Sequence, residues 1–439
     1  MIRRFLAILL IGTVNQFGFA QSFDKTKLDN YFNALEANNR FMGSVAVTKD
    51  GAVIYSRSIG FSDAENNVKA DENTKYRIGS ISKTFTSVLA LKAVEEKKLD
   101  LNQSIDKYFP SIPNAKKVTV KHLLNHRSGI HNFTNNSDYL SWHTQPKTEK
   151  EMVAIITKGG SDFEPDSKAE YSNSNFVLLT YILEKAFNKS YSELLQKYIA
   201  KPIGLQNTYL AGKINADKHE SKSYTFANTW KIEPETDISI PLGAGGIIST
   251  SNDLTKFSDA LFGGKLLKAE SLEAMKSIKD GYGIGLVKIP FQDKTGFGHT
   301  GGIDGFTSVF SYFSDGNISY ALISNGTNYN NNNISITVLK SVYGKAYDIP
   351  EFSTYKVNSK DLDKYLGVYG SKEFPLKITV TKGDNALIAQ ATGQSSFPLE
   401  PTEKDKFKFD QAGIILEFNP IEKTMVLKQG KGQFTFTRE

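Results

Sequence analysis

The sequence predicts an α+β fold in two domains: an antiparallel sheet with helices and a helical subdomain, followed by a small antiparallel β-barrel. Strand-like runs lie at both ends of residues 21–343, helical patterns fill the middle of that range, and short alternating runs follow it. With 439 residues, of which 39% are apolar, the chain is long enough to form two hydrophobic cores.

The N-terminus has the three regions of a secretory signal peptide. Basic Arg3 and Arg4 precede an apolar run over residues 5–14, and small residues lead up to Ala20. We expect residues 1–20 to be removed and the mature protein to be periplasmic or secreted. No stable membrane anchor is expected to remain, because the apolar run is too short to span a bilayer. The chain has no cysteine, which excludes disulfides and a thiol nucleophile.

Hairpin signals frame the first domain, which we expect over residues 21–343. After a helix-like segment at 28–36, two alternating runs at 44–47 and 52–56 flank Asp50-Gly51, a strong turn signal. A second antiparallel pair is expected at the other end of the domain, with a helix after it; these elements span residues 307–313, 318–324 and 334–343. The sheet is therefore expected to combine both ends of the domain, with the helical part inserted between them.

The tail of the chain has a different pattern. Residues 344–358 are expected to form a linker, and residues 359–439 contain short alternating runs typical of a small antiparallel barrel. The runs lie at 365–369, 376–381, 386–391, 407–409, 414–418, 424–428 and 433–438. None of them carries a chemical signature, so no catalytic role is assigned to this domain.

A serine and a lysine at the start of a long apolar segment are the first candidates for catalysis. Ser80 and Lys83 form S-x-x-K, and apolar residues follow at helical spacing; the same motif at Ser22, Ser104 and Ser353 opens no such helix. Backbone N–H groups at a helix N-terminus stabilise an oxyanion, and the i, i+3 spacing places the ammonium near the hydroxyl. Lysine acts as a base only when burial or neighbouring cations lower its pKa.

Tyr171-Ser172-Asn173 is the second candidate motif. The phenol oxygen of Tyr171 is suited to take the serine proton and later return it to the leaving group. The amide of Asn173 both donates and accepts, which suits it to hold a substrate carbonyl and Lys83. Asn173 also directly precedes an apolar run at 176–183, where a helix cap is expected, so both roles stay open.

Two motifs compete for the third position, His299-Thr300-Gly301-Gly302 and the K-T-G sequence that begins at Lys294. On one strand, Lys294 and His299 are an odd number of residues apart and face opposite sides of the sheet. We favour His299, since the glycines allow close approach to a ligand. His299, Thr300 and Gly301 are assigned to substrate binding, with the backbone N–H groups of Ser80 and Gly302 as the oxyanion hole.

The sequence does not favour a metal site, a nucleic-acid partner or a cofactor. His122, His126 and His131 are close in sequence, but the glutamate of H-E-x-x-H is absent, so structural histidines are expected and no metal. Trp142 and Trp230 are left out of the site as packing residues. The formal net charge of +6 comes with no basic cluster, which argues against nucleic acid. No cofactor is implied; a small molecule or short peptide is the expected partner.

Taken in order, these motifs resemble the serine β-lactamase and D,D-peptidase superfamily, on the branch with class C β-lactamases, D-aminopeptidases and related esterases (peptidase S12 type). Further similar segments are L-L-N-H-R-S-G at 123–129, G-G-x-x-S-T-x-x-D-L at 245–254 and Y-G-I-G at 282–285. The resemblance covers roughly residues 30–330. The tail resembles the lipocalin-like domain attached to many bacterial members of this family.

The resemblance implies a β-lactamase/transpeptidase-like fold in which Ser80 is acylated and Lys83 and Tyr171 are its proton partners. His299 stands where class C β-lactamases usually carry lysine, which resembles certain D,D-peptidases and D-aminopeptidases. We therefore expect a serine hydrolase that forms an acyl-enzyme on small amides or esters, such as D-amino-acid peptides or β-lactams. The alternative is a penicillin-binding or peptide-sensing protein that is acylated with little turnover.

Overall fold

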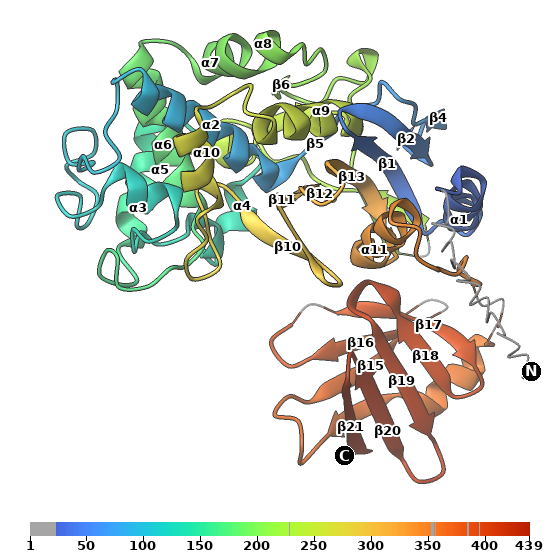
Figure 1. Ribbon diagram of the computed structural model, residues 1–439. Helices are drawn as coiled ribbons and strands as arrows, with labels where there is room; N and C mark the ends of the chain where they lie inside the picture. The colour runs from blue at the N-terminus through green and yellow to red at the C-terminus, as the bar shows by residue number, and fades with distance from the viewer. Residues whose placement is uncertain (1–22, 228, 353–354, 356, 384–385, 395) are drawn as a thin grey trace, which may run out of the picture.

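The computed structural model describes residues 23–439 except 228, 353–354, 356, 384–385 and 395. The signal peptide expected over residues 1–20 lies outside the described residues. An α+β domain with a helical subdomain at one side lies above a β-barrel (Figure 1). The predicted fold class is therefore confirmed.

The first domain is organised around one six-stranded antiparallel sheet. Its spatial order is β10 (Val287–Phe291), β11 (Lys294–Ile303), β12 (Phe306–Phe313), β13 (Ile318–Thr327), β1 (Phe41–Lys49) and β2 (Ala52–Ile59). The two ends of the domain thus join in the middle of the sheet, where Val45 of β1 pairs with Leu322 of β13. As predicted, Asp50 and Gly51 turn β1 into β2, and their φ values of 51° and 78° match the turn type that favours Asp-Gly.

Helices cover both faces of this sheet. Helices α1 (Lys25–Ala37) and α11 (Asn331–Val342) pack on one face, which we call the outer face. Helix α9 (Ser251–Phe262) packs against β1, β12 and β13 on the opposite, inner face, with the helical subdomain beyond. β1 and β13 are buried along nearly their whole length, which explains their runs of apolar and small residues.

The helical subdomain is built on two helices, α2 (Ser82–Glu95) and α6 (Asn173–Phe187), which pack against each other. Both are buried on most sides, so their apolar residues do not form a single stripe. The other α-helices are α3 (Val120–Leu124), α4 (Tyr139–Trp142), α5 (Glu149–Gly159), α7 (Tyr191–Leu195), α8 (Lys201–Ile203) and α10 (Ala269–Lys276). Small sheets are formed by β3 (Phe61–Asp63) with β4 (Val68–Lys69), by β5 (Tyr76–Arg77) and β6 (Tyr209–Leu210) with β9 (Ile247–Ser249), and by β7 (Tyr224–Ala227) with β8 (Thr229–Ile232).

The C-terminal domain is a closed, eight-stranded antiparallel barrel. Its strands are β14 (Gly367–Gly370), β15 (Ile378–Lys382), β16 (Leu387–Ala391), β17 (Phe397–Glu403), β18 (Lys406–Phe409), β19 (Ile414–Asn419), β20 (Thr424–Gln429) and β21 (Gly432–Arg438). Sequence patterns predicted seven runs and missed β17, because Pro398 and Pro401 interrupt its strand signal. Buried apolar side chains, including Tyr365, Phe407 and Phe436, fill the interior, as in small barrels generally.

The barrel contacts the first domain where β1 begins and β13 ends. Arg40, just before β1, forms a salt bridge with Glu400 of β17 and lies 4.6 Å from the ring centroid of Phe352. Gln411, in the barrel turn Asp410–Ala412, donates to the carbonyl of Thr327 at 2.5 Å, and its own carbonyl accepts from the side chain of Asn330. Arg40 and Thr327 lie beside each other at one sheet end, so the barrel is tied to both strands.

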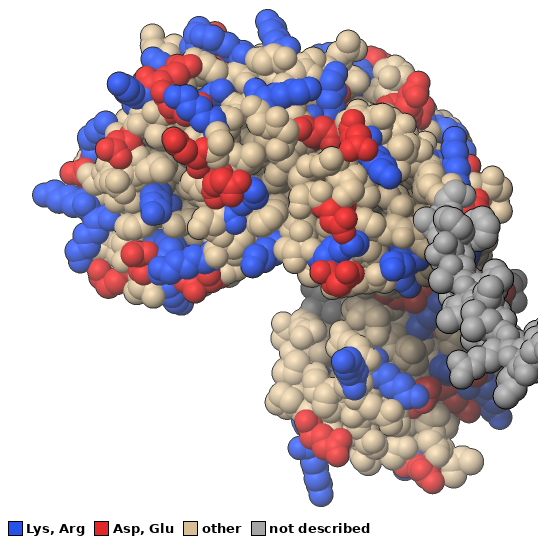
Figure 2. All heavy atoms as spheres, in the orientation of Figure 1, with Lys and Arg blue, Asp and Glu red and all other residues tan. Residues whose placement is uncertain are grey.

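Basic and acidic side chains are mixed over the face seen in Figure 2. This pattern gives no single-sign surface on that face for a nucleic acid or an acidic membrane. Within the ranges that the structure describes, no helix has both the length and the apolar character needed to cross a bilayer.

Candidate active site

Ser80 lies in a short 3-10 turn, Gly79–Ile81, that runs directly into helix α2. Gly79 has a φ of +51°, and a Cβ built on it would lie 2.7 Å from the backbone nitrogen of Gly302. Only glycine combines this backbone conformation with so close an approach. Gly79 therefore brings the turn that carries Ser80 next to the strand that carries Gly302.

Lys83 lies one turn further along and is completely buried. Its Nζ is 3.0 Å from Ser80 Oγ, 2.8 Å from Asn173 Oδ1 and 2.6 Å from the carbonyl oxygen of Ala244. No carboxylate accepts from Nζ among the described residues. Burial lowers the pKa of the Lys83 ammonium well below its usual range, which meets the condition that the sequence hypothesis set.

Tyr171 reaches the same serine from the other side. Its hydroxyl donates to Ser80 Oγ at 2.7 Å, and its ring centroid is 4.8 Å from Lys83 Nζ. Burial raises the pKa of the phenol, and the hydrogen bond to Ser80 opposes this only in part. Tyr171 is therefore a neutral phenol, able to donate a proton, rather than a phenolate that waits to accept one.

Asn173 is the first residue of α6, and its two possible roles are resolved by its contacts. Its side-chain oxygen accepts from Lys83 Nζ, and its side-chain amide donates to the hydroxyl of Thr134 at 3.2 Å. Its backbone N–H donates to the side chain of Asn132 at 3.0 Å. The cap position belongs to Ser172, so the side chain of Asn173 holds the lysine and does not cap the helix.

The third motif lies on strand β11, and its residues divide between the two sheet faces. His299 is 5% exposed and lies on the inner face near Lys83, whereas Lys294 pairs with Asp315 at the far end of the strand. His299 Nδ1 donates to the carbonyl of Thr300 at 2.6 Å, which leaves Nε2 as an acceptor. Burial, and secondarily the charge of Lys83, lowers the pKa of His299 to about 4, so the ring is neutral near pH 7.

Thr300 does not have the position that the sequence interpretation gave it. It pairs with Val309, which packs on the outer-face core, so its side chain lies on the face opposite His299. Only its backbone reaches the site, through the bond to His299. Gly301 lies on the same side of the strand as His299, and a Cβ there would lie 2.1 Å from the carbonyl of Ile78, just before the Ser80 turn.

His126 is a site residue whose role sequence reasoning missed. Its backbone carbonyl accepts from the N–H of Glu170 at 2.9 Å, and its Nδ1 accepts from the N–H of Ser172 at 3.2 Å. Its ring packs against that of Tyr171 at a tilt of 31°, with centroids 4.5 Å apart. His126 thus holds the residues on both sides of Tyr171 as well as the phenol itself. Burial lowers the pKa of its imidazole well below the usual range, so Nδ1 stays an acceptor.

A buried ion-pair network supports the end of β11. Arg77 is 1% exposed and forms salt bridges with Glu235 and with Asp304, the residue after the strand. Asp304 also accepts from the backbone and hydroxyl of Thr236. The network fixes the turn that follows Gly302, and no sequence motif marks it.

The histidines that suggested zinc have separate contacts. The ring of His122 accepts from the backbone of Thr119 in a capping box, and the ring of His131 lies 3.0 Å from the carboxylate of Asp162. In the described part of the chain, no group of three or more His, Cys, Asp or Glu is arranged to hold a metal ion.

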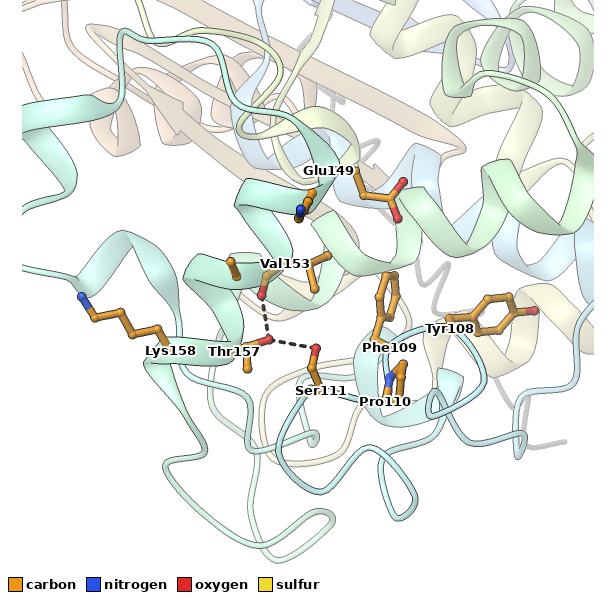
Figure 3. Close-up of a pocket in the computed structure, with 10 residues that line it drawn as sticks. Tyr108, Phe109, Pro110, Ser111, Glu149, Val153, Thr157 and Lys158 are labelled. Atoms are coloured by element: carbon orange, nitrogen blue, oxygen red, sulfur yellow. Dashed lines mark hydrogen bonds between the residues drawn. The ribbon is translucent and has the colours of Figure 1, made fainter.

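A groove of about 720 Å³ lies elsewhere on the subdomain, between the loop with Tyr108 and Phe109 and one side of α5 (Figure 3). Thr157 donates to the carbonyl of Val153 there and bonds the hydroxyl of Ser111. None of the candidate catalytic residues lines this groove, and it holds no buried nucleophile with a base beside it. This groove is therefore separate from the Ser80 site.

The fold and this site define a class of protein. A serine at the start of a helix, hydrogen-bonded to a buried lysine and to a neutral tyrosine beside a glycine-rich strand, is the arrangement of a serine acyl-transfer enzyme. The protein family model described as "Beta-lactamase" matches residues 28–340. The chain belongs to this family, and it is a β-lactamase-family serine hydrolase.

The match to one relative extends over both domains. "Penicillin-binding protein 4*" of Bacillus subtilis is 24% identical over 434 residues, which cover 89% of this chain and 93% of that protein. "Teichoic acid D-alanine hydrolase" of Staphylococcus aureus is 30% identical over 232 residues, so this match spans about half of each chain, 52% here and 55% there.

Solved structures agree with this assignment. The D-amino acid amidase from Ochrobactrum anthropi, complexed with L-phenylalanine amide, matches with a TM-score of 0.64 and 26% identity over 72% of this chain and 99% of its own. The octameric penicillin-binding protein homologue from Pyrococcus abyssi matches with a TM-score of 0.66 and 25% identity over 94% of this chain and 100% of its own.

Proposed function

We propose that the protein hydrolyses small amides or esters of D-amino acids through an acyl-enzyme on Ser80, and that it does so in the periplasm or outside the cell. The observation that carries the proposal is the contact of one serine oxygen with two proton partners, Lys83 Nζ at 3.0 Å and the Tyr171 hydroxyl at 2.7 Å. Signal-like residues 1–20 support the location.

The proton path follows from the two pKa shifts. Lys83 in its neutral form takes the proton of Ser80 while Oγ attacks the carbonyl carbon, and the backbone N–H groups of Ser80 and Gly302 bind the oxyanion. When the tetrahedral intermediate collapses, Tyr171 protonates the leaving nitrogen or oxygen, and its phenolate then takes the proton that Lys83 holds, which returns Lys83 to its neutral form. Water then enters in place of the leaving group, and the steps run in reverse to release the acid.

The chemistry of His299 favours a substrate that presents an amino or amide group to its ring over one that presents a carboxylate there. Its Nδ1–H is used by the carbonyl of Thr300, so only the acceptor Nε2 remains for a ligand. A neutral acceptor suits an ammonium or an amide N–H and repels a carboxylate oxygen. Relatives named for D-amino acid amides and for teichoic acid D-alanine support the same substrate class.

A penicillin-binding protein with little turnover is the second candidate function. The similarity to "Penicillin-binding protein 4*" favours it, because that match covers 93% of the relative and both domains of this chain. Both candidates require acylation of Ser80, and they differ in how fast the acyl group leaves.

The test incubates the mature protein separately with D-alanine p-nitroanilide, its L-isomer, D-alanine methyl ester and a fluorescent penicillin. The mass of the protein reports the acyl adduct, and product release reports turnover. Ser80→Ala should remove labelling and turnover, while Ser104→Ala, in the other S-x-x-K with described surroundings, should keep both. Release of product from the D-isomers with a transient acyl mass supports the hydrolase. A penicillin adduct that persists, with no turnover of the D-aminoacyl compounds, supports the second candidate. Equal labelling of Ser80→Ala and the unmodified protein overturns both.

A further inference from the structure

A cavity of about 750 Å³ lies on the outer face of the sheet, directly behind the strand that carries His299. Strands β10 to β13 form its floor, helix α11 one wall, and Gln411 of the barrel closes one side. Thr300 and Gly301 line it from behind, but Ser80, Lys83, Tyr171 and His299 do not, so the cavity is distinct from the catalytic cleft. Its volume is in the range of small-molecule sites.

The body of the cavity is apolar. Helix α11 contributes Ile336 and Leu339, and the strands contribute the largest share, from Ile289, Phe291, Val309 and Leu322. The helix and the strands thus enclose a slot in which an aliphatic or aromatic group loses its contact with water.

A charged side chain, that of Lys340, lies at one end of this slot. Lys340, in the last turn of α11, is the one charged side chain among the described lining residues, and it is half-buried. It forms no ion pair with a described residue, and no carboxylate lines the cavity. The opposite end, at the start of α11, is lined by neutral amides, including those of Asn331 and Gln411.

Two buried polar atoms in this cavity wall have no hydrogen-bond partner among the residues that the structure describes. Ser311 is completely buried, and its Oγ makes no hydrogen bond to a described residue. Its partner in the strand pairing is Tyr320, whose hydroxyl bonds Ser335 of α11. Residues paired across antiparallel strands share a face, so the Ser311 hydroxyl lies on the cavity side. Asn331 donates to Thr307 while its side-chain oxygen stays unpaired. A buried polar group without a partner costs free energy unless a ligand or water satisfies it.

We propose that this cavity is a second binding site, for an elongated apolar carboxylic acid whose carboxylate pairs with Lys340. The apolar body fills the slot between β10 to β13 and α11, and Ser311 offers a hydrogen bond at its floor. Such a ligand contacts Thr300, the residue whose carbonyl holds His299, and Gln411, so it touches both domains and the back of the catalytic strand.

Calorimetry with decanoate on the full chain tests this, with decanol as the uncharged probe. Decanoate should bind one site, and Lys340→Gln should weaken it about tenfold while decanol affinity stays the same. Lys345→Gln, at an exposed lysine just beyond α11, is the matched control and should bind as the unmodified protein does. Ile336→Trp, which fills the slot, should abolish binding of both probes.

A diazirine derivative of decanoic acid locates the site independently of activity. Peptide mapping should place the label within β10 or α11, in the unmodified protein and in Ser80→Ala alike. The proposal is overturned by labelling of the Ser80 cleft instead, by equal affinities of Lys340→Gln and Lys345→Gln, or by no saturable binding.

Discussion

The imidazole of His126 packs against the phenol of Tyr171 with 4.5 Å between centroids, while its carbonyl and Nδ1 accept from the residues on either side of that tyrosine. Three separate contacts from one residue therefore define where the Tyr171 hydroxyl lies. His126 itself has a φ of +59°, a conformation that asparagine tolerates better than most residues.

His126→Asn tests this positioning. Asparagine keeps an acceptor for Ser172 and the backbone conformation but removes the ring, so the fold should persist while kcat falls about tenfold with little change in KM. Steady-state kinetics and thermal unfolding measure the two effects. His122→Asn, at the capping histidine, should leave kcat unchanged; an equal loss in both variants would point to a general structural effect.

Lys83 governs the dependence of acylation on pH. Because burial lowers its pKa, Lys83 loses its proton at a lower pH than an exposed lysine does, and the acylation rate should fall as the pH drops through that pKa. Lys83→Arg keeps a cation that cannot lose its proton, so the acylation rate should fall on the order of a thousandfold. Stopped-flow acylation measures this, and Lys83→Met reports whether the fold persists without the amine. Near-normal acylation by Lys83→Arg at neutral pH would remove lysine from the proton path.

His299 makes the folded state sensitive to acid. Its pKa of about 4 lies below the ordinary 6.5, so between these values the unfolded chain binds more protons than the folded one. The free energy of unfolding should therefore drop as the pH falls from about 6.5 to about 4, with His299 contributing about 3 kcal/mol. Urea unfolding at pH 7 and 4.5 should show a smaller drop for His299→Gln. His219→Asn, at an exposed histidine, should behave as the unmodified protein.

The two candidate third motifs can be separated by mutation. His299→Ala removes the acceptor at the cleft and should raise KM for D-alanine p-nitroanilide about tenfold. Lys294→Ala removes contacts with Asp293, Asp315 and Tyr343 away from the cleft and should leave both kcat and KM unchanged. A larger effect of Lys294→Ala than of His299→Ala would reverse the assignment.

Arg77 is expected to matter for stability. Arg77→Met leaves the carboxylate of Asp304 buried without its partner, which should lower the free energy of unfolding by about 3–5 kcal/mol. Arg57→Met removes a more exposed pair, with Asp29, and should cost about 1 kcal/mol at most. Chemical denaturation measures both, and similar losses in the two variants would contradict a special role for the buried network.

The sequence was informative where function or folding depends on local spacing. The i, i+3 relation of Ser80 and Lys83, and the Asp50-Gly51 turn, are set within a few residues, and the structure shows both as predicted. The lysine contact with Asn173 also follows from a motif, since both residues begin helices that pack together.

Features that arise from tertiary contacts could not be predicted from the sequence. Nothing in the sequence around His126 reveals that it holds Tyr171, and nothing around Ala244 reveals that its carbonyl accepts from Lys83. The one available signal was position: His126 lies within the segment 123–129, and Ala244 directly precedes the segment 245–254. Thr300 was misplaced because a motif was treated as a unit, although neighbouring strand residues face opposite sides.

The pairing of Val45 with Leu322 has a consequence for biosynthesis. On the ribosome, β1 and β2 emerge first and can close their hairpin at once, yet the other edge of β1 stays open until β13 has been translated. The whole helical subdomain must be made in that interval, which gives the fold a high contact order and a slow final step. Until β13 is made, the nascent chain therefore presents an unpaired apolar strand that is prone to aggregation.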